Sequence, residues 1–166
     1  MKKIMFLIPC FLLLTCGANK PEMTVKLKSE CPKNGTCSIE LLKGKSMALK
    51  KDEFGRNIYT LEENANKSVI KYCYSKTVKD NLQDAGYREE IFFEWSPKIK
   101  TILNEELQNT KMLFGRFCYC KGQTGYYKIS KGSLKVTPKR KEKSVTLHFE
   151  TDEVPQIIKD VTFSIK

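Results

Sequence analysis

Apolar and polar residues alternate with a period of two along most of this 166-residue chain. This pattern is typical of β-strands that have one buried and one solvated face. Strands are predicted at residues 24–29, 37–42, 47–50, 58–62, 68–76, 88–95, 112–120, 126–129, 134–137, 144–150 and 161–165. Turn-forming pairs such as Asn34-Gly35 and Lys131-Gly132 separate them. Many short strands at this spacing predict a mainly β fold, a single antiparallel β-sandwich or barrel-like domain.

One segment departs from the alternation. Ser96 and Pro97 have the residue types of a helix N-cap followed by proline in the first turn. Beyond them, apolar residues recur at nearly helical spacing at Ile99, Ile102, Leu103 and Leu107. A short helix near residues 97–108 is therefore predicted, packed on a sheet by its apolar side.

The N-terminal segment has a different character. Lys2 and Lys3 precede an apolar run over residues 4–14, which is the arrangement of an export signal. The run is too short to span a bilayer, which takes about 20 apolar residues. It ends in Leu13-Leu14-Thr15-Cys16, a motif that resembles the lipobox of bacterial lipoproteins.

In bacterial lipoproteins the cysteine thiol receives a diacylglyceryl group, the chain is cut before it, and the new amine is acylated with a fatty acid such as palmitate. The resemblance implies a signal peptide over residues 1–15 and lipidation of Cys16. The short polar segment that follows is suited to a tether over residues 16–23, and the strand pattern predicts a β domain over residues 24–166. The resemblance also implies export and lipid anchoring in the cell envelope. Gly17 directly after the cysteine favours the outer membrane over the inner one.

Two further observations bear on this assignment. Cys16-Gly17-Ala18 also fits the small-x-small site of an ordinary signal peptidase, which would release a soluble secreted protein after Ala18. The rest of the chain, rich in lysine and mostly β, is similar in general composition to uncharacterised lipoproteins of Bacteroidetes.

Five cysteines remain once Cys10 is removed with the signal and Cys16 is lipidated. An exported protein meets an oxidising environment, so these cysteines are expected to pair. Cys31 and Cys37 bracket the Asn34-Gly35 turn, which predicts a disulfide at the mouth of a hairpin.

Cys73 is predicted to bond to Cys120, with Cys118 on the same predicted strand as the alternative. Together with His148 these cysteines have the residue types of a metal site. However, zinc ligand pairs usually lie in a turn rather than a strand, and the alternation places His148 on the solvent face. No metal or other cofactor is expected.

The formal charge of +11 includes two signal lysines. A basic surface is suited to lipid headgroups, acidic glycans or nucleic acid, but export separates the protein from nucleic acid, which is not expected as a partner. The dense basic run at residues 139–143 lies between two predicted strands. It is interpreted as a charged hairpin loop of the kind that limits aggregation.

Aromatic residues supply the candidate binding surface. Neighbours on a strand point to opposite faces, so some rings of the aromatic clusters must face outward. Those predicted to border an exposed strip are Trp95, Tyr119, Tyr126 and Tyr127. Such a strip, flanked by lysines, is suited to a glycan or a protein partner in the envelope.

Motifs of common enzymes are missing from the sequence: there is no Gly-x-Ser-x-Gly elbow, no His-Glu-x-x-His and no glycine-rich phosphate loop. Acids that could serve a small carboxylate-based hydrolase are Glu89, Glu90, Glu94, Glu105 and Glu106. This remains a weaker alternative, because adjacent strand residues face opposite ways. The sequence favours a non-enzymatic, lipid-anchored protein that either binds a partner or serves as an accessory structural lipoprotein.

Overall fold

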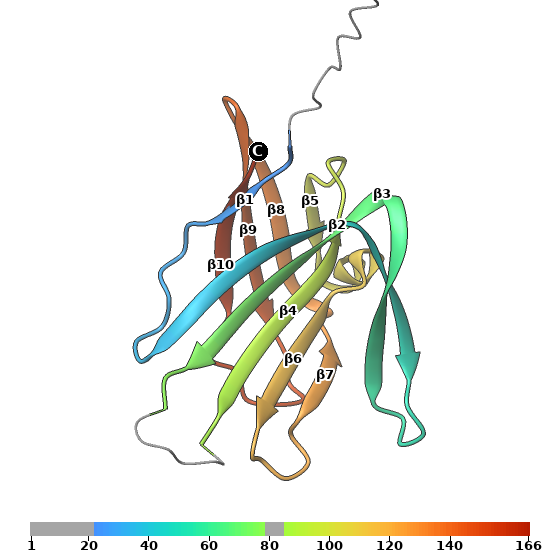
Figure 1. The fold of residues 1–166 in the computed structure, drawn as a ribbon, viewed down its shortest axis with the longest axis vertical. Helices are drawn as coiled ribbons and strands as arrows, with labels where there is room; N and C mark the ends of the chain where they lie inside the picture. The colour runs from blue at the N-terminus through green and yellow to red at the C-terminus, as the bar shows by residue number, and fades with distance from the viewer. Residues whose placement is uncertain (1–21, 79–84) are drawn as a thin grey trace, which may run out of the picture.

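The computed structural model describes residues 22–78 and 85–166. Within these residues the chain forms two antiparallel sheets that pack face to face (Figure 1). In spatial order, sheet A contains β1 (Val25–Leu27), β10 (Asp160–Ile165), β9 (Glu142–Glu150), β8 (Lys131–Lys139) and β5 (Thr101–Leu103). Sheet B contains β2 (Gly35–Lys51), β3 (Asn57–Lys76), β4 (Tyr87–Trp95), β6 (Leu113–Cys118) and β7 (Gly125–Lys128). The predicted mainly β sandwich is confirmed.

The main core lies between the sheets and is built from alternate residues of each strand. The inward side chains of β9 and β4 are Val145, Leu147, Phe149, Ile91, Phe93 and Trp95. Rings from the two sheets meet at Phe114 and Phe149, whose centroids are 5.6 Å apart. Each buried side chain of this size stabilises the fold by about 1.5–3 kcal/mol. A one-residue slip in register would turn these side chains to solvent, so the apolar pattern fixes the pairing.

Two strands are much longer than predicted. The predicted strands at 37–42, 47–50, 58–62 and 68–76 merge into the single β2–β3 hairpin. This hairpin turns a corner where residues 64–67 of β3 lie opposite the single residue Gly44 of β2. Gly44 has a φ of 66°, a backbone region that glycine adopts without steric cost. The corner is the green arch beside the β3 label in Figure 1.

Beyond the corner, the hairpin reaches the opposite edge of sheet B, where Asn57 pairs with Tyr126 of β7. Sheet B thereby curls in a barrel-like manner around a second, smaller core. This core consists of Met47, Val69, Phe92 and Leu113. The outer face of sheet B is therefore covered by its own longest hairpin rather than by another element.

The predicted helix is displaced and of a different type. Thr101–Leu103 form β5, which pairs with Lys135, Leu134 and Ser133 of β8. The helix follows as η1 (Asn104–Thr110), a seven-residue 3₁₀ helix anchored by the buried Leu107. Pairing with β5 satisfies backbone groups along β8 that would otherwise need another partner. This tertiary gain outweighs the local helix signal of Ser96 and Pro97.

Cys31 and Cys37 are joined by a disulfide with a Cα–Cα distance of 5.6 Å. The Asn34-Gly35 turn does not close a hairpin as predicted, because β1 pairs with β10 in sheet A and β2 pairs with β3 in sheet B. The disulfide therefore lies on the connection between the two sheets.

The predicted bond from Cys73 to Cys120 or Cys118 is wrong. Cys118 bonds to Cys120, and Cys73 is free and half-buried. Cys73 pairs with Glu90 on β4, which in turn pairs with Gly115 on β6. Cys118 therefore lies two strand spacings, about 10 Å, from Cys73 across the sheet. It is also displaced by three residues along β6 from Gly115. This separation exceeds the roughly 7 Å that a disulfide spans between Cα atoms, whereas the turn after β6 brings Cys118 and Cys120 to 5.2 Å.

The predicted signal peptide, Cys16 and the alternative cleavage site after Ala18 lie outside the described residues. Within the described part, backbone pairing begins at Thr24, whose N–H donates to the carbonyl of Lys166 over 2.9 Å. No helix among residues 22–78 and 85–166 is both long and apolar enough to cross a bilayer.

Candidate functional site

The four aromatic residues predicted to form one exposed strip do not lie together. Trp95 points into the main core and is 5% exposed. Tyr127 also packs against that core, at the other end of sheet B. Tyr126 faces the opposite side of the sheet, and Tyr119 is 83% exposed in the turn after β6. A continuous aromatic surface is therefore not formed.

Tyr126 belongs to an aromatic cluster inside the curl of sheet B. Its ring contacts Tyr59, Phe92 and Phe117 at centroid distances of 5.1, 6.2 and 5.3 Å. Gly115 makes room for the ring, because a Cβ there would lie 2.7 Å from Tyr126 Cε1. Burial raises the pKa of the Tyr126 hydroxyl well above its ordinary value. The phenol therefore stays neutral, and the cluster closes the smaller core instead of offering an open surface.

Trp95 lines a cavity of about 750 Å³ at the corner of β3. Three segments form its walls: the corner itself, the end of β4 with the loop that follows, and the region of η1. Its lining residues are Asn64, Asn66, Lys67, Glu94, Trp95, Ser96, Pro97, Lys98, Ile99, Ile102, Asn109 and Thr110. The volume is within the range of about 300–1,000 Å³ that is usual for ligand pockets.

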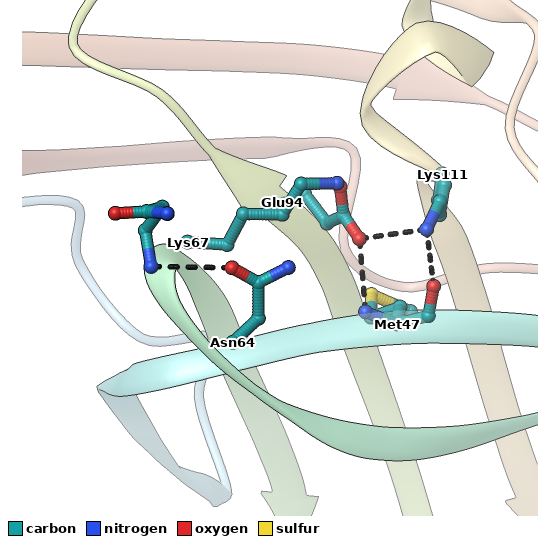
Figure 2. A network of polar contacts seen from close by, with 6 residues as sticks. Met47, Asn64, Lys67, Glu94 and Lys111 are labelled. Carbon is teal, nitrogen blue, oxygen red and sulfur yellow. Dashed lines mark hydrogen bonds and ion pairs between the residues drawn. The ribbon is translucent and has the colours of Figure 1, made fainter.

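Glu94 is the electrostatic centre of this site (Figure 2). Its carboxylate accepts hydrogen bonds from Lys67 Nζ at 2.7 Å, from Lys111 Nζ at 2.8 Å and from the backbone N–H of Met47 at 2.9 Å. Lys111 also donates to the carbonyl of Met47. The network joins β4, the corner of β3 and the residue after η1 to β2, so it holds the bent hairpin in place.

The same contacts set the ionisation of Glu94. Burial by itself would raise its pKa, but the hydrogen bonds from Lys111, Lys67 and the Met47 N–H outweigh burial and hold the pKa below its ordinary value. Glu94 is therefore a carboxylate at neutral pH. A glycosidase general acid needs a raised pKa, so the environment of Glu94 is the opposite of what acid catalysis requires.

The other acids do not form a catalytic pair. Glu89 points between the sheets and is fully buried, whereas Glu90 points into the curl of sheet B, where it contacts Arg88 Nε at 3.2 Å. Glu105 and Glu106 are exposed in the first turn of η1. His148 Nδ1 lies 2.8 Å from Asp160 on the outer face of sheet A. In the described part of the chain, no group of three potential metal ligands comes together.

The cavity is suited to a neutral, polar ligand. Asn64, Asn66 and Asn109 bring amides, which both donate and accept hydrogen bonds. Lys67 is paired with Glu94, so Lys98 is the one lining charge outside an ion pair among the described residues, and the three amides outnumber it. Apolar surface from Trp95 and the isoleucines complements these groups. Sugars, which combine hydroxyl groups with apolar ring faces, match this mixture.

Sequence reasoning missed the amides of this site. Asn64 and Asn66 lie between two predicted strands, where their residue types predict only an ordinary turn. The signal that could have found them is the unusual run Asn64-Ala65-Asn66-Lys67 interrupting one long alternating pattern. The Oδ1 of Asn64 accepts a hydrogen bond from the Asn66 N–H at 3.1 Å, which shapes the corner.

The fold and this cavity define a two-sheet β protein with a polar pocket at a strand corner. No protein-family model, no curated protein and no solved structure matches the chain.

Proposed function

We propose that this chain is a lipid-anchored protein of the cell envelope whose β-sandwich binds a neutral glycan without altering it. The observation that carries the binding role is the cavity of about 750 Å³ at the corner of β3, with amides, a compensated ion pair and Trp95 in its walls. A site of this volume accommodates a few sugar rings.

The anchoring part of the proposal rests on Leu13-Leu14-Thr15-Cys16 and the export signal before it. The two disulfides support export, because disulfides persist in oxidising compartments outside the cytoplasm. Acylation of Cys16 would place the domain at the membrane surface, and Gly17 favours the outer membrane.

Glycan binding is favoured over a flat protein interface by the distribution of exposed apolar side chains. Among the described residues the four most exposed of these belong to different parts of the chain: the β2–β3 turn, β5, the turn after β6 and the β9–β10 connection, at Phe54, Leu103, Tyr119 and Ile157. Scattered apolar residues are normal for a monomer, whereas a protein interface needs a contiguous patch. Binding is favoured over hydrolysis because the cavity carboxylate, Glu94, is ionised and held by two lysines.

The test uses a glycan array printed with neutral and acidic oligosaccharides, followed by titration of a neutral oligosaccharide that binds. Trp95 is the single tryptophan of the sequence, so its fluorescence reports on this cavity directly. We expect Asn66→Ala to weaken binding about fivefold to tenfold, the value of one or two lost hydrogen bonds.

The matched control is Thr60→Ala, which changes an exposed polar residue of the same strand outside the cavity. It should leave the affinity unchanged. Glycan binding is disproved if no neutral oligosaccharide on the array binds the wild-type protein. If Asn66→Ala and Thr60→Ala bind a glycan alike, the cavity is not the binding site.

A further inference from the structure

A second cavity, of about 320 Å³, lies on the other side of the wall formed by Trp95 and Pro97. Its lining is mainly apolar, from Met23, Trp95, Pro97, Pro138 and Ile165. The tip of the β8–β9 hairpin, the chain end marked C and the segment that leads into β1 all lie at this end of the molecule (Figure 1). We call it the tether end.

The rim of this cavity is strongly basic. Its cationic residues, with those of the adjoining hollow at the hairpin tip, are Lys139, Arg140, Lys141, Lys143 and Lys166. Glu142 is the one acid that lines either hollow. Lys143 Nζ donates to the carbonyl of Pro97 at 2.8 Å and so connects the hairpin to the apolar wall.

The tip of the β8–β9 hairpin carries a charged side chain at a position whose backbone conformation is unfavourable for it. Arg140 has a φ of 45°, in the left-handed region that is unfavourable for side chains other than glycine, asparagine and aspartate. Hairpin turns normally use Asn or Gly at such a position. An arginine flanked by two lysines there is poorly explained by turn formation and well explained by an anionic partner.

The tether end is also the end nearest the proposed lipid anchor. Met23 lines the apolar cavity, and Thr24 pairs with Lys166 beside it. Glu22 follows Cys16 by six positions in the sequence, and an extended chain of that length spans roughly 20 Å at most. Anchoring at Cys16 would therefore hold the basic rim close to the bilayer.

We propose that the tether end docks on a membrane surface rich in anionic phospholipid. The lysines and Arg140 meet the lipid phosphates, and the apolar cavity takes up the adjoining glycerol and acyl carbons of one lipid. The proposal rests on the anchor at Cys16 for its geometry. It adds a fixed orientation, in which the domain lies against the bilayer instead of moving freely on its tether.

The experiment uses the full-length protein purified from bacterial membranes and reconstituted with vesicles that carry dansyl-labelled headgroups. Energy transfer from Trp95 to dansyl reports how closely the tether end approaches the lipid. One set of vesicles is phosphatidylcholine, and the other contains phosphatidylglycerol as well. We expect transfer to be several-fold stronger with phosphatidylglycerol and to fall when salt is added.

Charge reversal supplies matched variants. Each basic residue near an anionic surface contributes roughly fivefold to binding, so Lys139→Glu/Lys141→Glu should lower the energy transfer on phosphatidylglycerol vesicles to the level seen on phosphatidylcholine. Lys50→Glu/Lys51→Glu makes the same charge change on exposed lysines beside the tip of the β2–β3 hairpin, at the other end of the molecule (Figure 1). This control should dock like the wild type.

Flotation with phosphatidylcholine vesicles, recorded on the same samples, separates the two proposals. If the protein floats on both lipids but its energy transfer is unaffected by phosphatidylglycerol, the lipid anchor is supported and the docking surface is refuted. The opposite outcome is a protein that fails to float on phosphatidylcholine and still shows energy transfer on phosphatidylglycerol. If only Lys139→Glu/Lys141→Glu abolishes that transfer, the lipid anchor is refuted and the docking surface is supported. Equal losses in the two charge variants would mean that net charge alone attracts the protein, which also overturns docking.

Discussion

Replacement of Glu89 by alanine is expected to lower the free energy of unfolding by about 3–5 kcal/mol. Glu89 lies on β4 and is fully buried between the sheets. Its carboxylate accepts hydrogen bonds from the backbone N–H groups of Ile157 at 2.6 Å and Ile158 at 2.8 Å. These groups belong to the connection between β9 and β10, so one side chain of sheet B holds a loop of sheet A. Alanine would leave the buried N–H of Ile158 and the part-buried N–H of Ile157 without this acceptor.

Glu89→Gln is the matched variant, because it keeps the volume and one oxygen acceptor. Its cost should be clearly smaller than that of alanine, and urea denaturation measures both. Tyr87 gives a second readout: burial, followed by its hydrogen bond to Glu89, raises the pKa of its hydroxyl to about 12. In Glu89→Ala the tyrosinate absorbance of Tyr87 should appear at lower pH. Equal stability of Glu89→Ala and the wild type would refute the role of this carboxylate.

Gly132→Ala is expected to be similarly damaging, with a loss of about 3–5 kcal/mol. Gly132 pairs with Phe149 across β8 and β9 and has a φ of 130°. A Cβ at this position would lie 2.1 Å from the carbonyl oxygen of His148 and 2.7 Å from the Cα of Phe149. Both atoms belong to the backbone of a central strand, so neither can move without breaking the ladder of sheet A.

Gly125→Ala controls for backbone conformation. Gly125 has a similar φ, of 144°, but a Cβ there meets no atom within 4 Å. Its substitution should cost about 1–3 kcal/mol, the penalty for a residue held in a sparsely populated backbone region. The difference between the two variants in thermal or urea unfolding measures the contact at Gly132. Equal destabilisation would show that φ alone decides the outcome and that the close approach has no separate effect.

The apolar alternation was sufficient to predict the strands that face the main core, except β5, whose residues were predicted to be helical. In β9, for example, Val145, Leu147 and Phe149 all point to the buried side, so apolar residues recur at every second position of the sequence. The corner of the β2–β3 hairpin has no comparable sequence pattern, because Gly44 and residues 64–67 have the residue types of an ordinary turn. Whether a turn ends a strand or bends it depends on partners elsewhere, here Glu94 and Lys111.

The same dependence on distant partners limited the prediction of the site. Cys73 and Cys118 carry the residue type for a disulfide, but their separation follows from the register of β3, β4 and β6, which sequence spacing does not reveal. Trp95 was predicted to border an exposed strip; it is buried instead, and it lines both the cavity at the corner of β3 and the cavity at the tether end. The amides around it come from segments that meet only in the folded chain.

Mass spectrometry of the N-terminal peptide, on protein isolated separately from the membrane and soluble fractions of a bacterial host, tests the lipid anchor most directly. We expect the chain to begin at Cys16, with a diacylglyceryl group on the thiol and an acyl group on the amine. The Cys16→Ser variant should carry neither group and keep its first fifteen residues. An unmodified chain that begins at Asn19 and is recovered from the soluble fraction would contradict the anchor and establish a secreted protein.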